Sequence, residues 1–185
     1  GNQADPTLTF TGAGAGTLNT TTPGTEGTNG IDTMTGGTGN DTFVLDSGDS
    51  AAAPSATVFE TITDFGVTTT NKDVLDYADG NLSIVTNATA AAGTAKITSA
   101  GIATFNAADD TLAEKIVATE AGINAGGTAG AGQMAIFQHG DDAYLFISEG
   151  SDGVDANDTL VKLVGIDTTS TTSDVVTIAE GQATL

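Results

Sequence analysis

The nine residues from Gly36 to Val44 constrain the fold of this chain more than any other stretch. Three glycines and an aspartate occupy fixed places in its first six residues, and Phe43 fills an apolar place in the β-favouring run that follows. The glycines permit positive φ angles and close approach of the main chain, so they predict a tight turn. The preceding nine residues, 27–35, repeat the pattern in register and lose only the second glycine, to Thr28. Two consecutive copies predict short coils that stack on one another, with one apolar side chain of each pointing inward.

Each copy carries one aspartate at the same place, Asp32 in the first nonapeptide and Asp41 in the second. Calcium takes about six to eight oxygen ligands, more than one short turn offers, so adjacent turns have to share an ion. We therefore expect Asp32 and Asp41 to face each other across one coil step and to bind calcium together with main-chain carbonyls. The alternative is a flexible loop rich in glycine and aspartate. The agreement of register, spacing and apolar place in both copies favours the metal site.

These nonapeptides resemble the calcium-binding β-roll of the repeats-in-toxin (RTX) family, found near the C-termini of bacterial proteins exported by type I secretion. The residues 61–66 and 72–77, Thr-Ile-Thr-Asp-Phe-Gly and Lys-Asp-Val-Leu-Asp-Tyr, are similar to the closing strands of such rolls in RTX proteases and surface-layer proteins. Glu60 stands where an aspartate is common in that ending, and Tyr77 replaces the usual leucine. The repeat and the resemblance together predict a calcium site that uses Gly27, Asn29, Asp32, Gly36, Gly37, Gly39, Asp41, Asp64 and Asp73.

The expected fold is mainly β, with a parallel β-roll followed by a mostly antiparallel β region that contains one α-helix. Residues 1–26 read as a lead-in rich in threonine and glycine, with a strand at 7–11. Residues 27–80 hold the β-roll and its closing strands, and the right-handed coils are expected within 18–77. Residues 81–185 form a C-terminal β-rich module, whose tail carries the secretion signal that the resemblance implies.

The helix is expected over about 107–121. Asn106 is the predicted N-cap, and Asp109 and Asp110 would lie in the first turn, where the helix dipole favours acidic groups. Gly122 is expected to end the helix. Its apolar stripe would be formed by Leu112, Ala113, Ile116, Val117 and Glu120.

The last third of the chain predicts β-structure in short segments. A hairpin is expected from 134–138 and 143–147 around a turn at 139–142. Further strands are expected at 158–165 and 174–178. Short strands before the helix are expected at 82–86 and 95–98.

The charge of the chain is strongly one-sided, with 24 acidic residues against 4 basic ones and a formal net charge of −20. Such a surface repels nucleic-acid phosphates and anionic lipid headgroups and attracts cations, so we expect no nucleic-acid binding. Mutual repulsion should keep the metal-free chain loose, and folding should be coupled to calcium binding. The sequence contains no cysteine, so disulfides and thiolate metal sites are excluded. The sequence contains no run of about 18 apolar residues, so it does not predict a membrane-spanning segment.

Other acidic positions leave more than one interpretation open. Asp46 and Asp49 fit calcium ligands and solvated turn residues equally well. The loop with Asp152, Asp155 and Asp158 slightly favours a solvated loop over a further calcium site. For Asp109 and Asp110, helix N-terminal chemistry is favoured over metal binding.

No catalytic motif accompanies the single histidine, His139, which lies beside Asp141 and Asp142. We therefore expect this chain not to be an enzyme. The favoured function is a calcium-binding RTX module of a protein that is secreted and stays extracellular or on the bacterial cell surface. The alternatives are a calcium-dependent assembly unit of a surface layer and an adhesin or ligand-binding module. The expected partners are calcium, the type I ABC exporter during export, and further copies of the chain or cell-surface polysaccharide.

Overall fold

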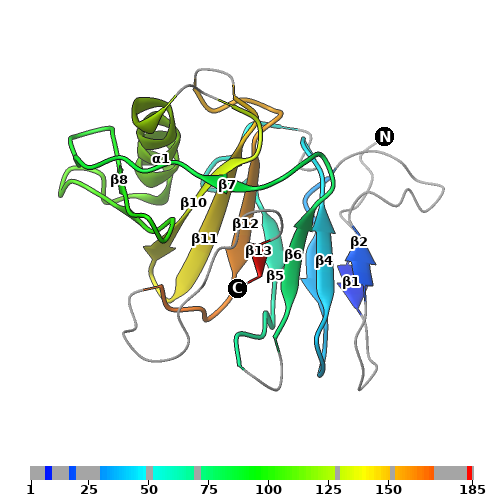
Figure 1. Cartoon of the computed structure of the whole chain (residues 1–185). Coiled ribbons are helices and arrows are strands. Elements are labelled where there is room, and N and C mark those ends of the chain that lie inside the picture. The colour runs from blue at the N-terminus through cyan, green and yellow to red at the C-terminus, as the bar shows by residue number, and fades with distance from the viewer. Residues whose placement is uncertain are drawn as a thin grey trace.

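A computed structural model describes residues 7–9, 17–19, 30–48, 52–68, 72–127, 130–150, 153–168 and 183–184. In this part the protein is mainly β with one helix, as the sequence predicted (Figure 1). The strands form a seven-stranded, a four-stranded and a two-stranded sheet.

The first six strands are short and alternate between the two larger sheets. They are β1 (Thr7–Thr9), β2 (Thr17–Asn19), β3 (Thr33–Thr35), β4 (Thr42–Leu45), β5 (Glu60–Ile62) and β6 (Val74–Tyr77). Strands β1, β3 and β5 pair in parallel at one end of the seven-stranded sheet. Strands β2, β4 and β6 pair in parallel in the four-stranded sheet. The chain therefore crosses from one sheet to the other after every strand.

The remaining elements complete a mixed seven-stranded sheet. They are β7 (Ser83–Ile84), β8 (Lys96–Ile97), β9 (Ala103–Thr104), α1 (Leu112–Gly126), β10 (Gln133–His139), β11 (Asp142–Ser148), β12 (Thr159–Leu163) and β13 (Ala183–Thr184). The predicted hairpin is confirmed as β10 and β11, and β12 pairs antiparallel with β11. Strand β12 also pairs in parallel with β5, and β10 pairs in parallel with β7. Strands from both the 27–80 and the 81–185 segments thus share one sheet.

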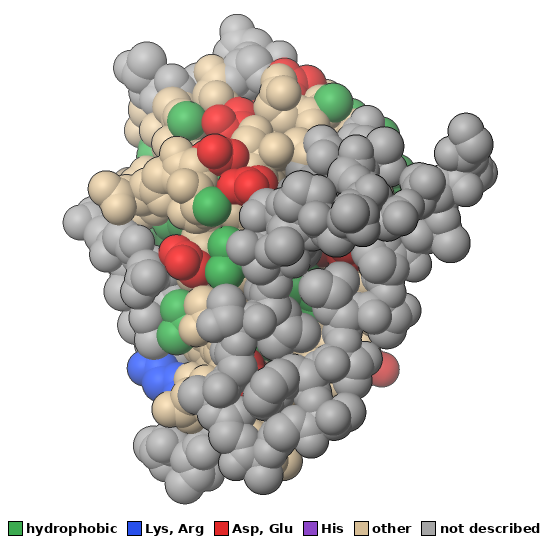
Figure 2. All heavy atoms as spheres, turned by 90° about the vertical axis from the view of Figure 1, so that its right-hand side faces the viewer, with side chains coloured by type: hydrophobic (Ala, Val, Ile, Leu, Met, Phe, Trp, Pro, Cys, Tyr) green, Lys and Arg blue, Asp and Glu red, His purple; other side chains and the backbone are tan. Residues whose placement is uncertain are grey.

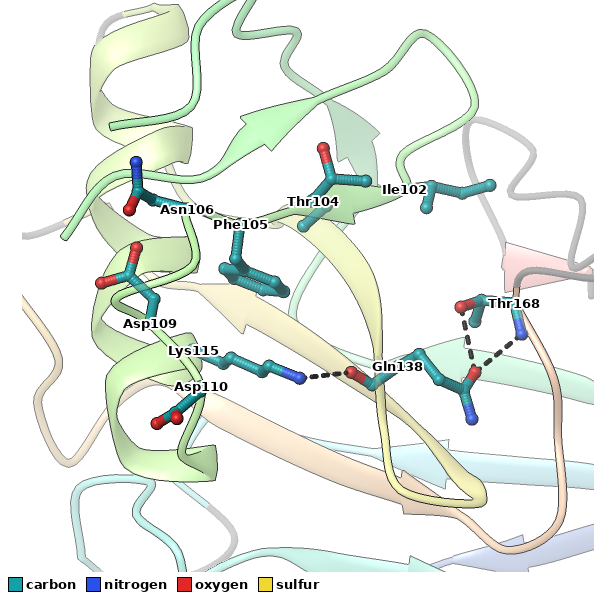
Figure 3. Close-up of a pocket in the computed structure, with 10 residues that line it drawn as sticks. Ile102, Thr104, Phe105, Asn106, Asp109, Asp110, Lys115, Gln138 and Thr168 are labelled. Carbon is teal, nitrogen blue, oxygen red and sulfur yellow. Dashed lines mark hydrogen bonds between the residues drawn. The ribbon is translucent and has the colours of Figure 1, made fainter. Parts of the chain in front are cut away.

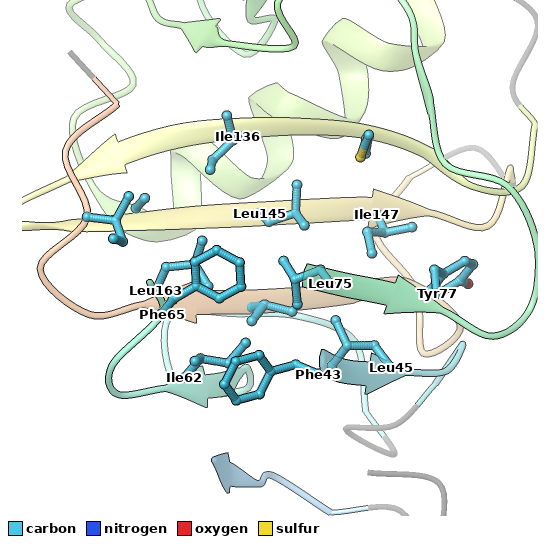
Figure 4. Close-up of a cluster of buried hydrophobic side chains, with 14 of the residues drawn as sticks. Phe43, Leu45, Ile62, Phe65, Leu75, Tyr77, Ile136, Leu145, Ile147 and Leu163 are labelled. Carbon is cyan, nitrogen blue, oxygen red and sulfur yellow. The ribbon is translucent and has the colours of Figure 1, made fainter. Parts of the chain in front are cut away.

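The larger hydrophobic core lies between the seven-stranded and the four-stranded sheets. The apolar places of the two nonapeptides, Met34 and Phe43, are both 0% exposed within it. The register pairs Met34 with Ile62 in one sheet and Phe43 with Leu75 in the other. Figure 4 shows Phe43, Ile62 and Leu75 in one cluster with side chains from β11 and β12. The apolar residues of both nonapeptides are therefore part of one common core.

A second core lies on the opposite face of the seven-stranded sheet, beneath α1 and the β8–β9 pair. Strand β10 sends Met134 and Ile136 into the first core and Ala135 and Phe137 into the second. Burial on both faces explains why this strand is almost continuously apolar rather than alternating. The ring of Phe137 stacks on Tyr144 of β11 with centroids 5.6 Å apart.

The helix begins at Leu112 and not at 107, so the predicted N-terminus is wrong. Thr111 is the N-cap, because its hydroxyl accepts from Glu114 N at 3.3 Å while the Glu114 carboxylate accepts from Thr111 N at 3.0 Å. This capping box outcompetes the Asn106 start. Asp109 precedes the helix and instead accepts a hydrogen bond from Gly93 N at 2.9 Å.

The helix also runs through Gly122 to Gly126. A Cβ at Gly122 would lie 2.5 Å from the Ala95 carbonyl oxygen, so this glycine serves close packing and not helix termination. The predicted stripe is partly wrong, because Ala113 and Val117 are exposed, Val117 by 56%. Leu112, Ile116, Glu120 and Ile123 lie on the buried side.

The strands predicted on either side of the helix had different outcomes. The strands expected at 82–86 and 95–98 are present in shorter form as β7 and β8. The strand expected at 174–178 lies outside the described residues. Among the described residues, no helix has the length and apolarity needed to cross a membrane.

Candidate metal centre

The turn from Gly36 to Asp41 links β3 to β4 and depends on its glycines for separate reasons. Gly37 and Gly39 have backbone φ angles of 91° and 134°, which residues other than glycine rarely adopt. At Gly36 a Cβ would lie 2.6 Å from Oδ2 of Asp41. The absence of a side chain at Gly36 therefore leaves room for the Asp41 carboxylate.

Asp32 and Asp41 do not pair across one coil step as predicted. Asp32 precedes β3 in the seven-stranded sheet, whereas Asp41 precedes β4 in the four-stranded sheet. Asp32 N donates to Glu60 Oε2 at 2.6 Å, and Asp41 N donates to Asp73 Oδ1 at 2.8 Å. Because the chain changes sheets after each nonapeptide, the turns that stack are two units apart and not one.

The carboxylates of Asp64 and Asp73 hold the Gly36–Asp41 turn through main-chain amides. Asp64 accepts from Gly36 N at 2.9 Å and from Gly37 N at 2.7 Å. Asp73 accepts from Asp41 N and, at 2.7 Å, from Gly66 N. Hydrogen bonds to a charged acceptor are stronger than neutral ones. The two aspartates lie between β5 and β6, and their hydrogen bonds join this segment to the Gly36–Asp41 turn.

The site is anionic and poorly solvated. Asp41 is 1% exposed and Asp73 is 0% exposed. Burial raises the pKa of Asp73 above its ordinary value, and the charges of Asp41 and Asp64 add to this rise against the main-chain hydrogen bonds. A cation bound at this turn would relieve the repulsion among its buried carboxylates. The surface is acidic elsewhere as well: on the face shown in Figure 2, acidic side chains gather in the upper half, while a basic one appears at the lower left.

The donor chemistry fits a hard cation. Asp41, Asp64 and Asp73 offer only oxygen, the donor that calcium prefers. Within the described residues, no group of three or more histidine, cysteine, aspartate or glutamate side chains is arranged to hold a metal ion. A calcium ion would therefore also need main-chain carbonyls, which glycine turns expose. The predicted ligands Gly27 and Asn29 lie outside the described residues.

Glu60 is a buried acid, which its position in the sequence, where an aspartate is common, did not predict. It is 0% exposed and accepts from the main-chain amide of Asp32, just before β3. The signal was present in the alternation of β5, where Glu60 and Ile62 share the inward side.

The histidine does not form a catalytic pair with Asp142. The Asp142 carboxylate is engaged by Lys162 Nζ at 2.7 Å and by Gly165 N at 2.8 Å. Burial lowers the pKa of His139, and the charge of Lys115 lowers it further. The ring of His139 packs edge-on against Tyr144, with centroids 6.2 Å apart. A packing role accounts for these contacts.

A cavity of about 380 Å³ lies beside the start of α1 (Figure 3). Lys115 Nζ lies 5.5 Å from the centre of the Phe105 ring and donates to the Gln138 carbonyl at 3.0 Å. Thr168 N donates to the Gln138 side chain at 2.9 Å. The lysine is thus held against the wall by an aromatic ring and a carbonyl.

No protein-family model matches the chain, and no curated protein matches it.

Proposed function

We propose that this chain is a calcium-binding RTX β-roll module of an extracellular bacterial protein exported by type I secretion. The observation that carries the proposal is the stacking of alternate strands, with the apolar residues of both nonapeptides in register with later coils. Met34 pairs with Ile62 and Phe43 pairs with Leu75. In a flexible loop rich in glycine and aspartate, Met34 and Phe43 would not be expected to be fully buried, as they are here at 0% exposure.

In this proposal, the turns around Asp32 and Asp41 hold calcium between stacked coils. Asp41 contributes charge from a place that Gly36 leaves open, and Asp73 approaches the same turn from the next coil. The bound ion supplies positive charge that offsets repulsion among buried carboxylates. The apolar side chains Met34 and Phe43 then stay stacked because the turns on either side of them are closed.

The net charge of −20 supports a switch in which the chain folds after export. Sites of extracellular modules have dissociation constants of about 10⁻⁴ to 10⁻³ M, so they are empty at submicromolar calcium and largely filled at millimolar calcium. Repulsion within the empty chain opposes compaction, and an unfolded chain suits passage through a narrow exporter. The type I ABC exporter is the proposed partner in that step, with its signal in the C-terminal tail.

The test is to measure hydrodynamic radius and far-UV circular dichroism in chelator and in millimolar calcium. The proposal expects an expanded chain with little β-structure in chelator and a compact one in calcium. Magnesium at the same concentration is the matched control, because it shares the charge of calcium but demands a smaller, more rigid site. A compact chain with the same radius in chelator and calcium would rule the switch out.

A surface-layer assembly unit is the second candidate, because β1 and β2 stand at the ends of the two larger sheets. Strand edges can pair with further coils or with another copy of the chain. Calcium-dependent growth of particle mass in light scattering would favour assembly over an isolated folding module. Binding to cell-surface polysaccharide without self-association would instead favour an adhesin.

A further inference from the structure

The buried side of α1 carries an acidic residue, Glu120, where it meets the end of β11. Glu120 is 1% exposed. Its Oε1 accepts from Ser148 Oγ at 3.2 Å and from Asn124 Nδ2 at 3.0 Å. Its Oε2 is buried with no hydrogen-bond donor, and so is Oδ1 of Asn124. Two buried oxygens one helical turn apart are thus left without a donor, which is costly unless a ligand satisfies them.

The loop between β11 and β12 brings further negative charge to this place. Asp158 is 1% exposed and accepts from Glu149 N at 3.0 Å and from Asp155 N at 2.8 Å. These two hydrogen bonds tie the Asp158 side chain to two earlier residues of the same loop. Burial raises the pKa of Glu120 to about 7, and the charges of Asp158 and then Asp155 contribute to the rise. Burial also raises the pKa of Asp158.

The lysines on the packed elements do not compensate this charge. Lys115, on the same helix, donates to the Gln138 carbonyl at the other end of β10. Lys162 of β12 forms its ion pair with Asp142. Lys96 of β8, a strand that packs against α1, is exposed to solvent. The Glu120 carboxylate therefore meets acidic groups from the loop, and none of these three lysines supplies the positive charge that would balance them.

We propose that Glu120, Asn124 and Asp158 bind one hard divalent cation, with calcium the fitting class, at the junction of α1 and the β11–β12 loop. Two carboxylates and an amide oxygen match the donor preference of calcium, and water can complete the shell. This site is separate from the Gly36–Asp41 turn and does not depend on the function proposed for it.

A proton is the competing occupant, since protonation of Glu120 would also remove its charge. The two readings differ in their response to pH. A cation displaces the proton, so calcium binding here strengthens from pH 6 to pH 8 and releases a proton at pH 7. A merely protonated Glu120 leaves calcium binding unchanged over this range.

Equilibrium dialysis of the full chain against calcium at pH 8 tests the proposal. Glu120→Gln keeps the size of the side chain and removes its charge, and Glu114→Gln removes the same charge from the exposed start of the same helix. The expected result is one fewer calcium ion bound by Glu120→Gln at 1 mM calcium, with the unaltered count for Glu114→Gln. The affinity lost should be at least roughly tenfold to hundredfold, the loss that follows removal of a supporting group from a metal site. Equal counts and affinities for all three chains would overturn the proposal.

A second variant keeps the test decisive if Glu120→Gln does not fold. Asn124→Asp adds a charge one turn from Glu120, which should tighten calcium binding at a cation site. Weaker or unchanged calcium binding by Asn124→Asp would count against the site. Asp41→Asn in the same dialysis separates the two hypotheses. Loss of an ion in Glu120→Gln but not in Asp41→Asn would support this site and contradict the proposed turn site.

Discussion

The main-chain N–H of Asp41 donates to the carboxylate of Asp73 at 2.8 Å, although 32 residues separate them along the chain. The contact joins the end of one glycine turn to the start of β6. It shows that the Gly36–Asp41 turn is held by a carboxylate from the segment just before β6, which accepts hydrogen bonds from main-chain amides. The carboxylates that would bind calcium therefore also accept hydrogen bonds from these main-chain amides.

Asp41→Asn should weaken the calcium dependence of stability. A site with a dissociation constant of about 0.1 mM stabilises the fold by about 2.7 kcal/mol at about 10 mM calcium, and most of this gain should be lost without the charge. Thermal melts at a series of calcium concentrations that keep the chain folded measure the effect. Asp110→Asn, at an exposed position before α1, is the control. Equal calcium-dependent shifts in the two variants would contradict the role of Asp41.

Phe43→Ala should strongly destabilise the protein in calcium. Phe43 is fully buried between the two larger sheets, and removal of such a ring costs about 3–5 kcal/mol. Val117→Ala is the matched control, because Val117 is 56% exposed on α1 and should change stability by less than about 0.5 kcal/mol. Urea unfolding monitored by circular dichroism measures both. Similar midpoints for the two variants would mean that the apolar place of the nonapeptide does not support the core.

Gly122→Ala should destabilise the protein even though alanine favours helices by about 1 kcal/mol over glycine. The new Cβ would lie 2.5 Å from the Ala95 carbonyl oxygen, a main-chain atom that cannot rotate away. Overpacking of this kind costs about 1–3 kcal/mol. At Gly127 a Cβ meets only a Val85 methyl at 3.3 Å, so Gly127→Ala should be nearly neutral. A higher melting temperature for Gly122→Ala would show that α1 packs less closely on β8.

The pH dependence of stability, measured at the lowest calcium concentration that keeps the chain compact, should reveal Glu120. Its pKa rises from 4.5 to about 7 on folding because burial and the charge of Asp158 disfavour the ionised form. A group whose pKa is raised in the folded state supports stability at low pH, and that support is lost as pH increases from about 4.5 to about 7. The loss amounts to roughly 3 kcal/mol. Urea unfolding at a series of pH values should show this fall in the unaltered chain and a smaller fall in Glu120→Gln. Parallel curves for the two chains would contradict the assignment.

Local features of the chain were predictable because their causes lie within a few residues. The strands β3 and β4 follow from glycine turns and apolar places that recur every nine residues. The β10–β11 hairpin follows from two apolar runs on either side of a short turn. The helix was found, but its start was misplaced, since Asn106 and Thr111 both resemble N-caps and only Thr111 has Glu114 in the reciprocal position.

The candidate sites were predictable only in part. The turn that contains Asp41 was found from its spacing, whereas its contact with Asp73 was not, because the pairing of strands depends on which sheet each strand joins. Glu120 was assigned to an apolar stripe by its helical spacing. Only the packing of α1 on Ser148 shows that this acid is buried among other acids.

The sequence by itself determined the mainly β class, the repeating turns and the inward places of Met34 and Phe43. These depend on glycine torsions and on apolar periodicity, which act over one or two turns of chain. Only the tertiary structure decided that β12 joins β5 in parallel, across about a hundred residues, and that Glu60 and Glu120 are buried. Contacts between distant segments are selected by how well whole faces fit and exclude water, and that fit is a property of the assembled sheets and not of any one stretch.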